Sequence, residues 1–95
     1  MKYRKKPVVI EAFQLDRHFL NWPEWANYAL TKKEIISDNM GKFNDPSKKS
    51  FVSIMTPEGV MVGNEGDFII KGIKDEIYPC KPDIFLATYD LVEEK

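Results

Sequence analysis

Cys80 carries the strongest nucleophile in this chain of 95 residues. It lies between Pro79 and Lys81 and two residues before Pro82, where a helix is expected to begin. A neighbouring ammonium group and a helix N-terminus both lower the pKa of a thiol and favour the reactive thiolate. However, no histidine lies near Cys80 in the sequence to act as a base, and cysteine commonly serves as a small buried apolar residue. We favour the buried role and keep a small enzyme that uses Cys80 as an alternative.

Carboxylates are the second group of candidate catalytic residues. Glu11 is the only charge within an apolar strand, so it lies either at the rim of the sheet or in a polar pocket, because a buried unpaired carboxylate is costly. We favour the rim, and the alternative enzyme would pair Glu11 with Glu76. Some polar residues that alternate with apolar ones could line one end of the sheet, although we favour a solvated face: Lys71, Glu76, Tyr78 and Lys81.

Trp22 and Trp25 lie about one helical turn apart and could stack a planar ligand. At helical spacing they more simply form a core face. His18 is the only histidine, and no CxxC pair or carboxylate cluster accompanies it, so we expect neither a metal site nor a cofactor. We identify no catalytic residue set, and the chain is more consistent with a binding protein than with an enzyme.

The charge balance excludes most functions that require a strongly basic or strongly acidic protein. Fourteen basic and fifteen acidic residues give a net charge of −1, and the exception is the basic run 2–6, which contains one aromatic residue. This run could contact phosphates, although we favour a solvated arm. One cysteine cannot form an internal disulfide, and no signal peptide or stretch of membrane-spanning length is present. We expect a soluble cytoplasmic protein that does not enter membranes and binds nucleic acid, if at all, through its basic N-terminus.

Turn residues and apolar alternation predict the elements. We expect an antiparallel meander over 51–79, with a hairpin at Thr56-Pro57-Glu58-Gly59, and we expect Asp67 to bond backbone amides in a turn. Pro79 should end its strand because it lacks a donor. The other expected elements are a central strand over 8–15, a helix over 22–30 capped by Asn21, a strand over 34–37, an exposed loop over 38–50, a short helix over 82–88 and a closing strand over 89–92.

Together these elements predict one α+β domain over residues 1–95. We expect a curved antiparallel sheet of five to seven short strands, partly closed toward a small barrel, with one packed helix and a short C-terminal helical turn. The hydrophobic fraction of 43% is sufficient for a folded core. A chain of this size buries only about 60% of its surface, so it folds either alone or as a small homo-oligomer.

Two stretches resemble a family of small bacteriophage and prophage proteins of unassigned function. The first is the opening run MKYRKKPVVIEA at 1–12, and the second combines GDFIIKG at 66–72 with EIYPCKPDIF at 76–85 and the TY pair at 88–89. They cover about a third of the chain. Relatives tend to carry a glycine before the acid at the hairpin turn, where this chain has Asp75-Glu76. The resemblance implies a phage or prophage origin and a location inside a bacterial cell, and it supplies no catalytic residues.

The sequence therefore predicts a non-catalytic phage accessory protein that binds a small molecule or a host protein. Its candidate ligand-binding residues are Glu11, Trp22, Trp25, Lys71, Glu76, Tyr78, Cys80 and Lys81. The two alternatives are the small enzyme and a nucleic-acid-binding module that uses the basic N-terminus.

Overall fold

The computed structural model describes residues 1–4, 6–16, 22–37 and 51–92. The expected loop over 38–50, His18, the Asn21 cap and Lys5 lie outside the described residues.

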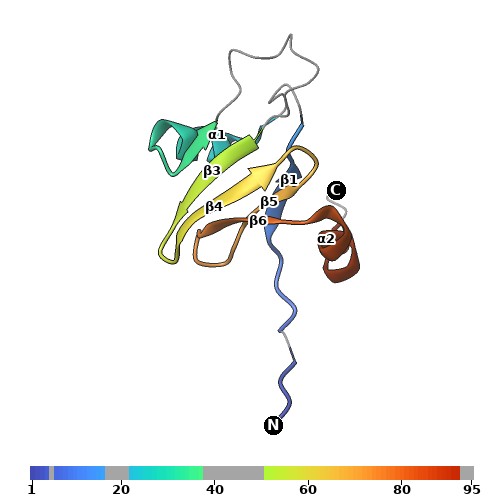
Figure 1. Cartoon of the computed structure of the whole chain (residues 1–95). Coiled ribbons are helices and arrows are strands. Elements are labelled where there is room, and N and C mark those ends of the chain that lie inside the picture. The colour runs from blue at the N-terminus through green and yellow to red at the C-terminus, as the bar shows by residue number, and fades with distance from the viewer. Residues whose placement is uncertain (5, 17–21, 38–50, 93–95) are drawn as a thin grey trace.

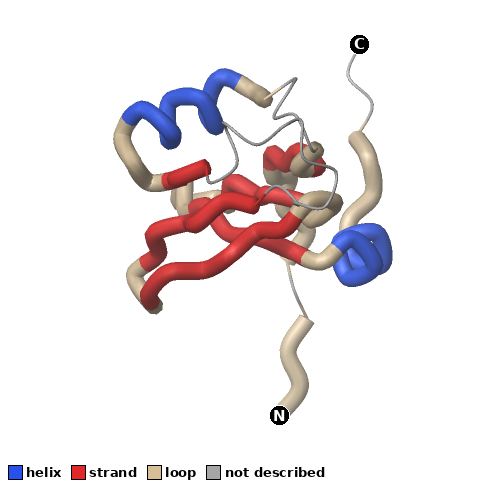
Figure 2. Tube along the Cα trace, turned by 45° about the horizontal axis from the view of Figure 1, so that its top comes forward, coloured by secondary structure: helices blue, strands red, loops and turns tan. Residues whose placement is uncertain are grey.

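The strands form two antiparallel sheets, and the α+β class is confirmed (Figure 1). One sheet has the strand order β1-β5-β6 and the other the order β2-β3-β4, and the two sheets do not close into a barrel. The two helices lie on opposite sides of the strands (Figure 2). The described elements are β1 (Glu11–Gln14), α1 (Glu24–Thr31), β2 (Ile35–Ser37), β3 (Phe51–Thr56), β4 (Gly59–Asn64), β5 (Phe68–Lys71), β6 (Ile77–Cys80) and α2 (Pro82–Thr88).

The β3–β4 hairpin forms where its turn residues predicted it. Thr56 and Gly59 pair across the turn, and the Thr56 hydroxyl donates to the Gly59 carbonyl at 2.6 Å. The same hydroxyl oxygen accepts the backbone N–H of Glu58 at 3.2 Å. Gly59 has a φ of +118°, a conformation that side-chain-bearing residues rarely adopt. The hairpin therefore has a fixed register.

The core lies where the two sheets meet beneath α1. It consists of fully buried aliphatic residues from both sheets and from α1: Leu15, Ala29, Ile35, Val52, Ile54 and Ile69. Gly63 of β4 lies at the meeting point, because a Cβ added there would be 2.8 Å from Ile69 Cδ1 and 3.3 Å from Val52 Cγ2. The absence of a side chain at Gly63 therefore permits the two sheets to approach each other.

Helix α1 packs its small residues against the core, with Ala26 and Ala29 buried. Phe13 of β1 contacts both tryptophans, with ring centroids 5.3 Å from Trp22 and 5.5 Å from Trp25. Both tryptophans are partly buried against the core cluster, as the helical spacing predicted. The expected packed helix is therefore present, and it begins at Glu24 rather than at residue 22.

Four details differ from the sequence-based expectations. The expected meander over 51–79 is divided, because β3 and β4 belong to one sheet and β5 and β6 to the other. Strand β1 is an edge strand, and residues 8–10 lie outside it, because β5 offers only four partner residues before the chain turns at Gly72. Pro79 lies within β6 and pairs with Ile69; β6 is also an edge strand, where the missing donor can face away from the sheet. Residues 89–92 form no strand.

Helix α2 is the short C-terminal helical segment that the sequence predicted. It begins at Pro82 after an extended Lys81, and it has no fully buried residue. Its attachment is aromatic: the Phe85 ring stacks on Phe68 of β5 with centroids 3.9 Å apart and an interplanar angle of 8°, and Tyr89 tilts against Phe85 at 5.0 Å. A helix of seven residues is too short to be stable alone, so this stack holds it in place.

Candidate acidic groove

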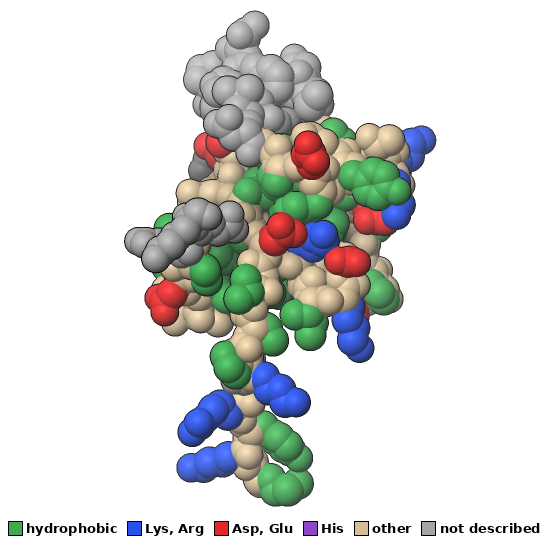
Figure 3. Space-filling model, turned by 180° about the vertical axis from the view of Figure 1, so that it is seen from behind, with side chains coloured by type: hydrophobic (Ala, Val, Ile, Leu, Met, Phe, Trp, Pro, Cys, Tyr) green, Lys and Arg blue, Asp and Glu red, His purple; other side chains and the backbone are tan. Residues whose placement is uncertain are grey.

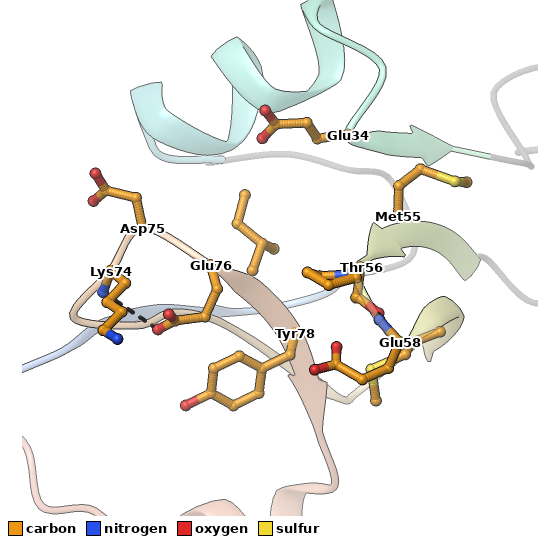
Figure 4. A pocket seen from close by; sticks show the side chains of 11 residues that line it. Glu34, Met55, Thr56, Glu58, Lys74, Asp75, Glu76 and Tyr78 are labelled. Carbon is orange, nitrogen blue, oxygen red and sulfur yellow. Dashed lines mark hydrogen bonds between the residues drawn. The ribbon is translucent and has the colours of Figure 1, made fainter.

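A groove of about 790 Å³ lies between the β3–β4 turn and the β5–β6 turn (Figure 4). The two turns belong to different sheets, and Glu34, just before β2, closes one side of the groove. The lining residues are Glu34, Met55, Thr56, Pro57, Glu58, Met61, Lys74, Asp75, Glu76, Ile77 and Tyr78. The groove thus depends on the packing that brings the two hairpins together.

The groove is acidic, with four carboxylates and one lysine among its lining residues. Lys74 donates its backbone N–H to Glu76 Oε1 at 3.4 Å, so Glu76 also shapes the turn. Glu34 Oε1 pairs with Lys32 Nζ at 3.1 Å, and this hydrogen bond raises the pKa of Lys32. Glu58 is exposed at the tip of the opposite turn. A cation that enters the groove would meet carboxylates from two sides.

Apolar side chains line the groove between these carboxylates. Met55 and Met61 are each about 40% exposed, although both are large apolar residues. Ile77 and Tyr78 from β6 contribute the other wall. In Figure 4 the Tyr78 ring lies between the Glu58 and Glu76 side chains. The groove therefore suits a ligand that has both positive charge and apolar surface.

Burial, followed by a hydrogen bond with Tyr89, raises the pKa of Tyr78 to about 12 from its ordinary value of 10.0. Both effects favour the neutral phenol in the folded protein. The resulting stabilisation is fully present below pH 10 and is lost as the pH rises through about 12.

We expect the absorbance difference between the wild type and Tyr78→Phe to show one tyrosinate appearing near pH 12. An ultraviolet titration of both proteins measures this difference. A residual tyrosinate signal centred near pH 10 would contradict the burial of Tyr78.

A smaller hollow of about 220 Å³ adjoins the groove and shares Glu34, Asp75 and Ile77 with it. Trp25 and Tyr28 of α1 form its aromatic side. Its remaining lining residues are Ala29, Lys32 and Lys71. The two hollows together extend from α1 to the β3–β4 turn.

Lys71 forms two ion pairs at one end of the smaller hollow. Its Nζ lies 3.5 Å from Glu11 Oε2 across the β1–β5 pair and 3.6 Å from Asp75 Oδ1. Asp75 has a φ of +63°, which aspartate tolerates better than most residues. Glu11 therefore lies at the exposed rim, paired with a lysine.

The eight residues expected in a site fall into different surroundings. Four of them line the two hollows: Trp25, Lys71, Glu76 and Tyr78. Glu11 lines neither hollow but pairs with Lys71, which lines the smaller one. Trp22 also lines neither hollow and packs against Phe13. Cys80 is free, half-buried and part of neither hollow.

Lys81 belongs to a structural cluster around Asp67. The Asp67 carboxylate is buried, accepts the backbone N–H of Asn64 at 2.9 Å and lies 3.3 Å from Lys81 Nζ. The backbone carbonyl of Asp67 accepts the N–H of Leu15 at 2.8 Å, which connects the turn to the end of β1. The expected role of Asp67 in bonding turn amides is confirmed.

Sequence reasoning did not single out several groove residues, chiefly Glu34, Glu58, Asp75 and Met61. The only local signal was that Glu58 and Asp75 lie in turns between paired strands. Only the contact between the two sheets brings these turns together.

Within the part of the chain that the structure describes, no three potential metal ligands cluster together. Neither described helix is long and apolar enough to cross a bilayer. Comparisons with protein-family models, curated proteins and solved structures give no match to this chain.

Proposed function

We propose that the protein is a non-catalytic phage or prophage accessory protein whose acidic groove binds a positively charged, partly apolar partner in the cytoplasm of a bacterial host. The partner is either a small cationic molecule or a basic segment of a host protein. The observation that carries this proposal is the placement of four carboxylates around the exposed side chains of Met55 and Met61 and the half-buried Tyr78. The positive charge of such a partner would contact the carboxylates, and its apolar surface would contact the methionine side chains.

The groove supports binding rather than catalysis. Its side chains include carboxylates and a phenol, whose raised pKa keeps it protonated at neutral pH, so that almost no phenolate is present to act as a base. Cys80 and Glu11 line neither hollow, and Glu11 is paired with Lys71. The enzyme alternative would need a reactive thiol or a close carboxylate pair.

The test compares binding of a synthetic Lys-Val-Lys-Val-Lys peptide to the wild type and to Glu58→Gln/Asp75→Asn/Glu76→Gln. These changes remove three charges, while the amide oxygen introduced by Glu76→Gln still accepts the Lys74 N–H and the asparagine introduced by Asp75→Asn tolerates the positive φ. We expect isothermal titration calorimetry to show a loss of affinity of at least about tenfold, because partly screened charge pairs contribute roughly 0.5–1 kcal/mol each. Added salt should weaken wild-type binding in the same direction.

The matched control is Glu24→Gln/Asp83→Asn/Asp90→Asn. These three residues are exposed and lie outside both hollows, so the net charge changes equally without a change in the groove. We expect this variant to bind the peptide nearly as well as the wild type. An equal loss in both variants would contradict the proposed function.

A further inference from the structure

Residues 1–4 and 6–10 belong to an arm that leaves the body of the protein at the start of β1 (Figures 1 and 3). Its described side chains up to Val9 are exposed, with Tyr3 87% and Val9 75% accessible. The Tyr3 hydroxyl lies 4.0 Å from the sulfur of Met1. Among the described residues, the arm cations Lys2, Arg4 and Lys6 form no ion pair.

The sequence of the arm favours an extended chain. Pro7 restricts Lys6 to extended backbone angles, and the next three residues are all β-branched. In an extended chain alternate side chains share one face, so Lys2, Arg4 and Lys6 form one cationic row. Ten such residues span roughly 33 Å, which is sufficient to cross a groove on another molecule.

The acidic groove complements this row in charge, with four carboxylates and one lysine among its lining residues. Glu58 lies in the turn that leads into β4, an edge strand whose Met61 lines the groove and is 40% exposed. Edge strands accept extended segments through their free backbone groups. In an extended arm Val8 lies on the same face as the cationic row, so it would contact the exposed Met61 of β4.

We infer that the arm of one copy lies in the acidic groove of a second copy, so that the protein forms an arm-exchanged dimer. The cationic row faces Glu58, Asp75 and Glu76, and Val8 on the same face of the arm lies against Met61 of β4. The inference rests on the proposed function, because it names a second copy of this chain as one partner of the same cation-binding groove. A second copy is favoured over the arm's own groove because the arm projects away from its own body (Figure 1).

The test uses two full-length charge-reversed proteins. The first carries Lys2→Glu/Arg4→Glu/Lys6→Glu in the exposed arm, and the second carries Glu58→Lys/Glu76→Lys in the groove. By sedimentation velocity we expect the wild type to dimerise and each variant alone to dissociate at least about tenfold more readily, because like charges then meet. Mixing the two variants should restore a dimer, because both exchanged pairs are again of opposite charge.

A folding control and four outcomes decide whether the arm exchange is correct. Thermal melting confirms that both variants are folded, and the exposed arm variant is expected to melt like the wild type. A wild type that stays monomeric, a dimer that arm reversal leaves intact, or a mixture that fails to associate would overturn the inference. A monomeric wild type that shifts a duplex DNA probe through its arm would also overturn it and assign the arm to nucleic acid.

The Lys-Val-Lys-Val-Lys peptide separates this inference from the proposed function. If the arm-reversed protein binds the peptide while the wild type is monomeric, the groove binds cations and only the arm exchange is wrong. If the peptide binds to neither protein, both proposals fail.

Discussion

Gly63→Val is expected to destabilise the protein by about 3 kcal/mol or more, since inserting even single methylene groups into a packed core costs about 1–3 kcal/mol. The new Cβ would lie 2.8 Å from Ile69 Cδ1, 3.3 Å from Val52 Cγ2 and 3.5 Å from Pro79 Cβ. Ile69 and Val52 are completely buried in different sheets, so neither can move without displacing the core. Small domains are stable by only about 5–15 kcal/mol, so this is a large fraction of the total.

Urea unfolding followed by tryptophan fluorescence measures this loss. Val62→Thr is the matched control, because Val62 precedes Gly63 in β4 and is 49% exposed. It should change the unfolding free energy by less than about 0.5 kcal/mol, as most surface substitutions do. A Gly63→Val protein as stable as the control would show that the two sheets do not approach each other at this residue.

Phe85→Ala is expected to release α2 from the sheet and to cost about 2–3 kcal/mol, below the range for a fully buried phenylalanine because Phe85 is only half-buried. The substitution removes the stack on Phe68 and the contact with Tyr89 together. Hydrogen exchange should therefore show fast exchange at Phe85 and Tyr89, whose N–H groups bond to Lys81 and Phe85 carbonyls in the native helix.

Leu86→Ala is the control for this experiment. Leu86 belongs to the same helix and is 67% exposed, so its truncation should leave protection in α2 nearly unchanged. Phe85→Ala should also lower the pKa of Tyr78, because a displaced Tyr89 no longer contributes the hydrogen bond that raises it. If both variants exchanged alike, the aromatic stack would not be what holds α2.

The sequence predicted elements well where single residues restrict the backbone. Thr56-Pro57-Glu58-Gly59 located the β3–β4 hairpin, and Pro82 located the start of α2, because each acts through its own dihedral angles or missing donor. The spacing of Trp22 and Trp25 likewise indicated which side of α1 packs inward.

Expectations that depended on a distant partner were less accurate. Residues 8–10 have the composition of a strand, but β5 pairs only with Glu11–Gln14 and provides no partner for them. Residues 89–92 alternate in hydrophobicity and form no strand for the same reason: alternation does not supply a neighbouring edge. The two sheets pack closely at Gly63, and the presence of one glycine in the sequence does not predict which strands approach each other there.

The groove was the least accessible feature from the sequence. Glu34, Glu58 and Asp75 are separated by long stretches of chain and have no shared motif. Tyr78 and Glu76 were singled out because they alternate with apolar residues, and this pattern alone could not distinguish a groove wall from an exposed face. They line a groove because hairpins from different sheets pack side by side.

The groove lies at the turns of two hairpins, whereas the packed core lies farther along the same strands, around Gly63 and Ile69. Substitutions at Glu58 or Lys74 therefore change the groove while leaving every buried side chain untouched. Selection on partner choice could therefore vary these two charged positions without changing the scaffold that holds them.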